Sequence, residues 1–60
     1  MKTAVTELSV LVADDSVTQR MHAQALCTDL GLTDVQGATD GRDALKILLA
    51  HKVDVALIDL

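Results

Sequence analysis

The chain has 60 residues, a net charge of −4, no aromatic residue and no proline. A chain of this length buries only about 60% of the surface of its unfolded form, so we expect one small domain with a small core. The acidic balance excludes a basic surface for direct nucleic-acid binding, and no apolar run is long enough to span a membrane.

The chain begins with a polar segment that leads into an apolar strand. Residues 1–7 (MKTAVTE) lack the apolar core of a signal peptide, so we expect a cytoplasmic protein. Residues 8–13 (LSVLVA) are predicted to form a strand that is buried on both faces. Asp14, Asp15 and Ser16 end this strand and supply side chains that cap a helix.

A first helix is predicted over residues 16–30, because Gly31 suits the position that follows a helix. Apolar residues three and four apart predict its buried stripe, which is Ala23, Leu26, Cys27 and Leu30. Cys27, the single cysteine, is interpreted as a small buried residue in a reducing compartment. A second apolar face is either thinly covered surface or a contact for a partner: Val17, Met21 and Ala25.

The second half of the chain predicts a strand, a helix and a further strand. Residues 34–38 form a short strand in which Gly37 indicates an edge position. A helix over residues 41–51 begins after Asp40, with Asp43 at capping-box spacing. The buried stripe of this helix is predicted to be Ala44, Leu45, Leu48 and Leu49. Residues 53–59 form the third strand, which is apolar except for its two aspartates.

The alternation of strands and helices predicts an α/β fold with a parallel sheet. Ligands of such sheets bind at the carboxyl ends of the strands, where the strand order reverses. If the first strand lies between the other two, Asp14, Asp15 and Asp59 face one crevice. No repeat or linker divides the chain, so residues 1–60 are one unit.

Three carboxylates at one sheet edge repel one another unless a divalent cation or a proton is bound. Mg²⁺ prefers oxygen ligands, so the cluster predicts a magnesium-dependent phosphate site held by Asp14, Asp15 and Asp59. Carboxylates also accept phosphoryl groups when a metal neutralises the charge. Asp59 is the better candidate nucleophile, because it stands alone at the end of what is predicted to be the most buried strand, opposite a metal held by Asp14 and Asp15.

The other polar residues are interpreted as structural. His22 and His51 have no further ligand at metal-binding spacing, so both are expected in solvent. Ser16 and Thr18 have no base nearby in the sequence and are assigned to a helix cap and a helix surface. Asp54 is assigned to the exposed start of the third strand, without a chemical role.

The motifs also resemble a known family. Residues 10–16 (VLVADDS), together with Arg20, resemble the opening of response-regulator receiver domains. Residues 54–60 (DVALIDL) resemble the third strand of the family, which ends in the phosphoacceptor. The intervening glycines and small residues also resemble the family pattern, so the similarity spans residues 8–60 in the expected order.

The resemblance implies a flavodoxin-like sheet in the order 2-1-3-4-5, of which this chain corresponds to a three-layer half with order 2-1-3. It implies that Asp59 accepts a phosphoryl group from a sensor histidine kinase or phosphotransfer protein of a two-component system, while Asp14 and Asp15 hold Mg²⁺. A receiver is not an enzyme in its own right. The Ser/Thr and Lys of the family have no counterpart here, so no catalytic set is complete and phosphorylation is expected to be slow.

Two other functions are weighed against this one. The third strand, central in the full family fold, is here an apolar edge, and such edges pair with other chains. The alternative is therefore a truncated, self-associating structural half-domain that dimerises through residues 53–59 and lacks phosphotransfer. An aspartyl-phosphate phosphatase ranks third, because that class places its nucleophile in a D-x-D arrangement that residues 14–16 lack.

Overall fold

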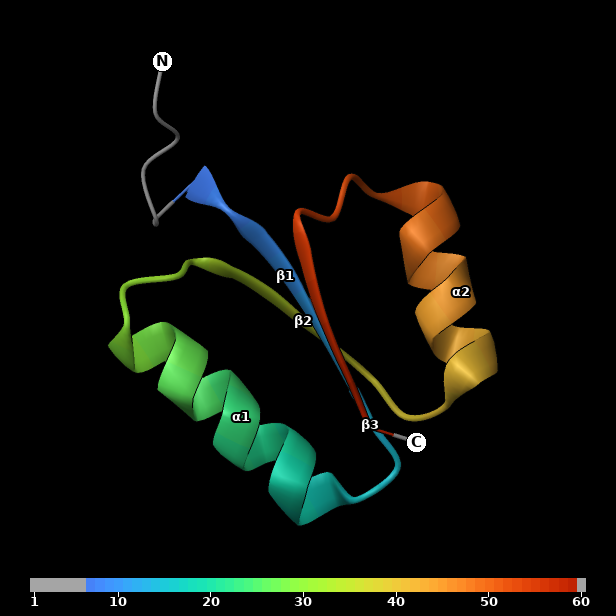
Figure 1. Cartoon of the computed structure of the whole chain (residues 1–60), viewed down its shortest axis with the longest axis horizontal. Helices are drawn as coiled ribbons and strands as arrows, with labels where there is room; N and C mark the ends of the chain where they lie inside the picture. The colour runs from blue at the N-terminus through green and yellow to red at the C-terminus, as the bar shows by residue number, and fades with distance from the viewer. Residues whose placement is uncertain (1–6, 60) are drawn as a thin grey trace.

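The computed structural model describes residues 7–59, in which strands and helices alternate along the chain (Figure 1). The elements are β1 (Ser9–Asp14), α1 (Val17–Asp29), β2 (Asp34–Ala38), α2 (Gly41–Ala50) and β3 (Val55–Asp59). Every predicted element is present within two residues of its predicted bounds. Most of the polar segment before β1 lies outside the described residues. Within the described range, no helix is long and apolar enough to cross a membrane.

The sheet is parallel, with the strand order β2-β1-β3. This order confirms the predicted α/β half-fold and places β1 in the centre. Gly37 lies in β2, which is an edge strand as predicted. In the register of the other pair, Val10 of β1 lies opposite Val55 of β3, and Asp14 lies opposite Asp59.

The two helices lie on opposite sides of the sheet, giving three layers (Figure 1). Successive residues of a strand point to opposite faces, so β1 contributes to two separate cores. Towards α1, Val10 and Val12 form a buried cluster with Cys27 and Leu32. Towards α2, the buried cluster consists of Leu11, Ala13, Ala38 and Ala44.

Side chains cap the amino ends of both helices as predicted. The Ser16 hydroxyl accepts a hydrogen bond from the Gln19 N–H at 3.3 Å. Asp40 Oδ1 accepts one from the Asp43 N–H at 2.8 Å. The Asp43 carboxylate in turn accepts the Thr39 N–H at 3.2 Å, one residue before the cap. These bonds satisfy amide groups that have no partner within a helix.

The end of α1 differs from the predicted stripe. Cys27 is buried and Ala23 packs against its cluster, but Leu26 and Leu30 are exposed, so their predicted burial is wrong. Gly31 adopts a φ of 93°, which favours glycine, and its N–H bonds the Thr28 carbonyl. The Leu32 N–H reaches back to the Cys27 carbonyl at 3.1 Å, which brings Leu32 into the core in place of Leu30.

The predicted stripe of α2 is also largely wrong. Ala44 is buried, and Ile47 packs beside it against the sheet. Leu45, Leu48 and Leu49 are exposed, with Leu49 at 80% of its full accessibility. Five of the seven residues 44–50 are Ala or Leu, so the sequence offers two apolar faces and does not by itself orient the helix.

β3 is the most exposed strand and β1 the most buried, so the prediction that the third strand is the most buried one is wrong. It begins at Val55, two residues later than predicted, and Val53 packs against the cluster under α2. All five residues of β3 are exposed, including the apolar Leu57 and Ile58. Within the described residues β3 has one neighbour, β1, so its outer edge is open as predicted.

Candidate functional site

The candidate site lies where β1 and β3 end. Asp14 and Asp59 are the last residues of these strands and lie directly opposite each other. Neighbouring strands are about 5 Å apart, and residues paired across them point to the same face. Asp14 follows Val10 and Val12 on the face that carries α1, so both carboxylates stand on the α1 side.

Asp14 is the buried member of this pair, with 8% of its surface exposed. Its Oδ1 accepts a hydrogen bond from the Ser16 N–H at 2.9 Å. This short turn fixes the carboxylate where the strand passes into α1. The bond engages Oδ1 and fixes the orientation of the carboxylate, which leaves Oδ2 available as a metal ligand.

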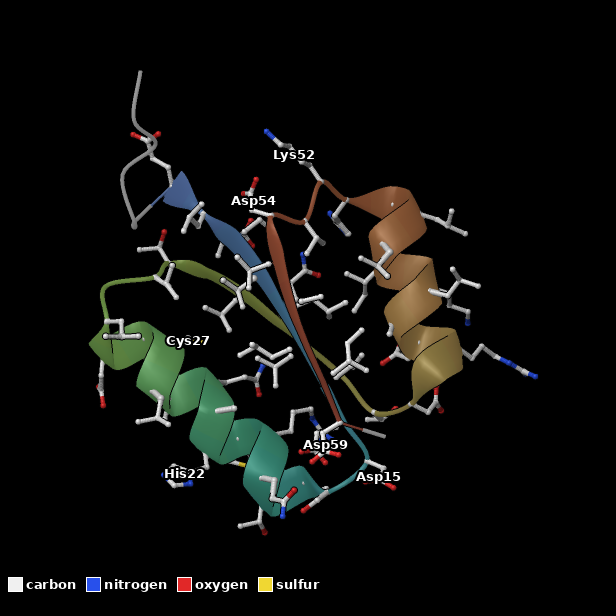
Figure 2. The ribbon with its side chains drawn as sticks, in the orientation of Figure 1. Asp15, His22, Cys27, Lys52, Asp54 and Asp59 are labelled. Atoms are coloured by element: carbon white, nitrogen blue, oxygen red, sulfur yellow. The ribbon has the colours of Figure 1, made fainter. Side chains whose placement is uncertain are left out.

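Asp15 and Asp59 are both exposed. Figure 2 shows them at the same end of the sheet, with the Asp15 side chain turned outward. Among residues 7–59, no three His, Cys, Asp or Glu side chains are grouped closely enough to hold a metal ion. The structure thus brings Asp14 beside Asp59 and leaves Asp15 on the adjoining turn, apart from the pair.

Arg20 is a further residue at this end of the sheet. It lies in the first half of α1, and its Nη1 donates a hydrogen bond to the Asp14 carbonyl at 2.8 Å. In the sequence, Arg20 is indicated only by the family resemblance. The local signal was an arginine one helical turn after the capping Ser16, which places it over the end of the preceding strand.

The remaining polar residues considered from the sequence lie outside the pair of aspartates. His22 and Thr18 are exposed on α1, and His51 is exposed at the end of α2. Cys27 is a free, buried cysteine, as expected. Figure 2 shows Cys27 and His22 on α1, apart from Asp59.

Asp54 has a structural role that the sequence did not predict. Its Oδ2 accepts a hydrogen bond from the Ser9 N–H at 2.9 Å, and its own N–H donates to the Ser9 carbonyl at 2.8 Å. These bonds join the start of β1 to the residue before β3. Asp54 lies at the opposite end of β3 from Asp59 (Figure 2). Its position opposite Ser9 indicates this role, but that position follows from the strand register, which the sequence alone does not give.

Replacing Asp54 with alanine is expected to lower the free energy of unfolding by about 1–2 kcal/mol, because the Ser9 N–H loses a charged acceptor. Asp54→Asn keeps an acceptor oxygen and should lose less. Urea unfolding followed by circular dichroism measures both changes. An alanine variant with the midpoint of the parent would show that this contact contributes no stability.

No family model, no curated protein and no solved structure matches this chain. The site is therefore interpreted from its own geometry. Asp14 and Asp59 lie side by side at the ends of parallel strands, and Asp15 lies on the adjoining turn. The Arg20 guanidinium bonds the Asp14 carbonyl.

Proposed function

We propose that the chain is a phosphoacceptor receiver module of a two-component phosphorelay, phosphorylated on Asp59. The observation that carries this proposal is the pairing of Asp14 with Asp59 at the carboxyl ends of β1 and β3. Parallel α/β sheets bind ligands at this position. The resemblance of residues 10–16 and 54–60 to receiver domains supports the same function.

The reaction is a transfer from a phosphohistidine on a sensor kinase or phosphotransfer protein. A carboxylate oxygen of Asp59 attacks phosphorus, so a P–O bond forms while the P–N bond to the donor imidazole breaks. The electron pair of that bond stays on the imidazole nitrogen, which takes a proton from water. Asp59 is exposed, so a large donor protein has access to it. The chain acts as acceptor and not as an enzyme on a separate substrate.

Asp14 and Asp59 are the proposed direct Mg²⁺ ligands, since the Asp15 side chain is turned away from them. Mg²⁺ binds through one or two carboxylates, completing its shell with water and substrate oxygens, so the adjacent Asp14 and Asp59 suit it without a third carboxylate in contact. When bound, the ion neutralises charge on the transferring phosphoryl group. Asp14 contributes a fixed oxygen, because the Ser16 N–H holds its carboxylate.

We place this module in the cytoplasm, where such donors act.

The test is the intact mass of the protein after incubation with acetyl phosphate and Mg²⁺. The parent is expected to gain a single phosphoryl group, and Asp59→Asn none. Asp54→Asn is the matched control, because it removes a carboxylate from the other end of the same segment. Chelation of Mg²⁺ should slow the reaction. A folded parent without an adduct, or an adduct that persists in Asp59→Asn, would contradict the proposal.

The exposed edge of β3 favours a second function, a self-associating structural half-domain. Its five residues are all exposed, and its outer backbone groups have no neighbouring strand among the described residues. A second copy of the chain is the proposed occupant, because two identical apolar edges can pair through their backbones. Asp59→Asn separates the two functions, since it removes the phosphoacceptor and leaves the edge intact.

A further inference from the structure

Arg20 is held in a defined position beside the candidate site. Its backbone belongs to α1, where its N–H bonds the Ser16 carbonyl at 2.9 Å. Its side chain extends to the end of β1 and donates from Nη1 to the Asp14 carbonyl. Both ends of this residue are therefore fixed, and it is half-buried.

Gly37 provides the space for this arrangement. A Cβ added at Gly37 would lie 3.3 Å from Arg20 Cδ and 2.7 Å from Gln24 Nε2. The stem of Arg20 thus lies close against the backbone of β2 before it reaches β1. A side chain at Gly37 would crowd the stem, so the glycine has a packing role beyond that of an edge residue.

The positive charge of Arg20 is directed to the face that carries Asp59. Within residues 7–59, the hydrogen-bond partner of its guanidinium is the Asp14 carbonyl, and no carboxylate forms an ion pair with it. A guanidinium has five N–H donors, and the Asp14 carbonyl engages one nitrogen. Asp59 stands on the same face, one strand spacing from Asp14.

We propose that Arg20 binds the phosphoryl oxygens at Asp59 and so completes the site with a cation supplied by α1. A planar guanidinium binds phosphoryl oxygens through parallel, charge-assisted hydrogen bonds. The inference rests on the proposed phosphoacceptor function. It adds a second source of positive charge besides Mg²⁺, and it gives Gly37 and the Asp14 carbonyl the role of positioning the arginine.

The test compares the parent with Arg20→Met, which keeps the stem, and Arg20→Lys, which keeps the charge. The initial rate of adduct formation is measured against acetyl phosphate concentration in the presence of Mg²⁺. We expect the half-saturating concentration of acetyl phosphate to rise about tenfold in Arg20→Met, because this variant loses a charge-assisted hydrogen bond to the phosphoryl group. Arg20→Lys should fall between the two. Arg42→Met, at an exposed arginine of α2, is the matched control and should behave as the parent.

A second measurement keeps the inference independent of adduct formation and of variant folding. Inorganic phosphate is added to the ¹⁵N-labelled parent with Mg²⁺, and the Arg20 Nε–H resonance is followed. A shift of this resonance is expected. If phosphate shifts this resonance but acetyl phosphate gives no adduct, the anion site is supported and the acceptor function of Asp59 is refuted. An unmoved resonance, or an Arg20→Met variant with the concentration dependence of the parent, would overturn the role of Arg20.

Discussion

Replacing Leu11 with alanine is expected to remove most of the stability of the fold. Leu11 lies in the central strand and is the largest fully buried side chain, at 0% exposure. Truncating a buried leucine to alanine costs about 2–5 kcal/mol, because apolar contacts are lost and a cavity remains. A domain of 60 residues has only about 3–9 kcal/mol in total, at 0.05–0.15 kcal/mol per residue.

The cost should be at the high end of this range, because the site cannot easily collapse. The buried neighbours of Leu11 on the α2 side are alanines, namely Ala13, Ala38 and Ala44. Small side chains have few rotamers with which to fill a void. Ile47 and Val53 are partly buried and already pack against this cluster.

Leu49→Ala is the matched control, because it removes the same atoms from a position that is 80% exposed. Its free energy of unfolding, obtained from the urea transition, should stay within about 0.5 kcal/mol of that of the parent. Circular dichroism measures both variants under the same conditions. Equal midpoints for Leu11→Ala and Leu49→Ala would show that the two-sided burial of β1 does not stabilise the fold.

The order of elements was predictable because their ends carry local signals. Asp14 and Ser16 end β1 and begin α1, while Asp40 begins α2, and all three act through hydrogen bonds to nearby residues. Gly31 ends α1 with a positive φ that other residues rarely adopt. Such interactions join residues only two or three apart, so the local sequence is enough to predict them.

The faces of the helices were harder to predict, because they depend on contacts distant in sequence. Leu30 fits the spacing of a buried stripe, yet the turn at Gly31 directs Leu32 into the core instead. In α2, Ile47 faces the sheet although the leucines around it are equally apolar. With so little sheet to cover, several large side chains remain exposed whichever way a helix is turned.

The candidate site was predictable in part for the same reason. A strand that ends in aspartate places that residue at the sheet edge, and the order β2-β1-β3 then brings Asp14 beside Asp59. The outward direction of Asp15 depends on the conformation of one turn. The bonds from Arg20 to Asp14 and from Asp54 to Ser9 depend on packing and register, which local patterns do not reveal.

The chain is expected to dimerise weakly through β3, and Leu57→Lys is expected to weaken the dimer at least tenfold. Leu57 is the central residue of Val55–Asp59, so a twofold antiparallel pairing of two β3 strands places it opposite its own copy. Two lysines there repel each other, and a lysine on an edge strand opposes pairing. Leu57 is 47% exposed, so the change should cost little folding energy.

The affinity of this dimer should be micromolar or weaker. Stable interfaces bury about 1,200–2,000 Å² in total, which one pair of five-residue strands does not reach alone. Sedimentation velocity over a range of concentrations measures the dissociation constant. Leu49→Lys carries the same charge change on α2 and should dimerise as the parent does. A folded parent that stays monomeric throughout, or two lysine variants with equal affinity, would refute pairing through β3. A dimer that persists in Leu57→Lys would instead indicate exchange of whole elements between copies, since that assembly does not use the β3 edge.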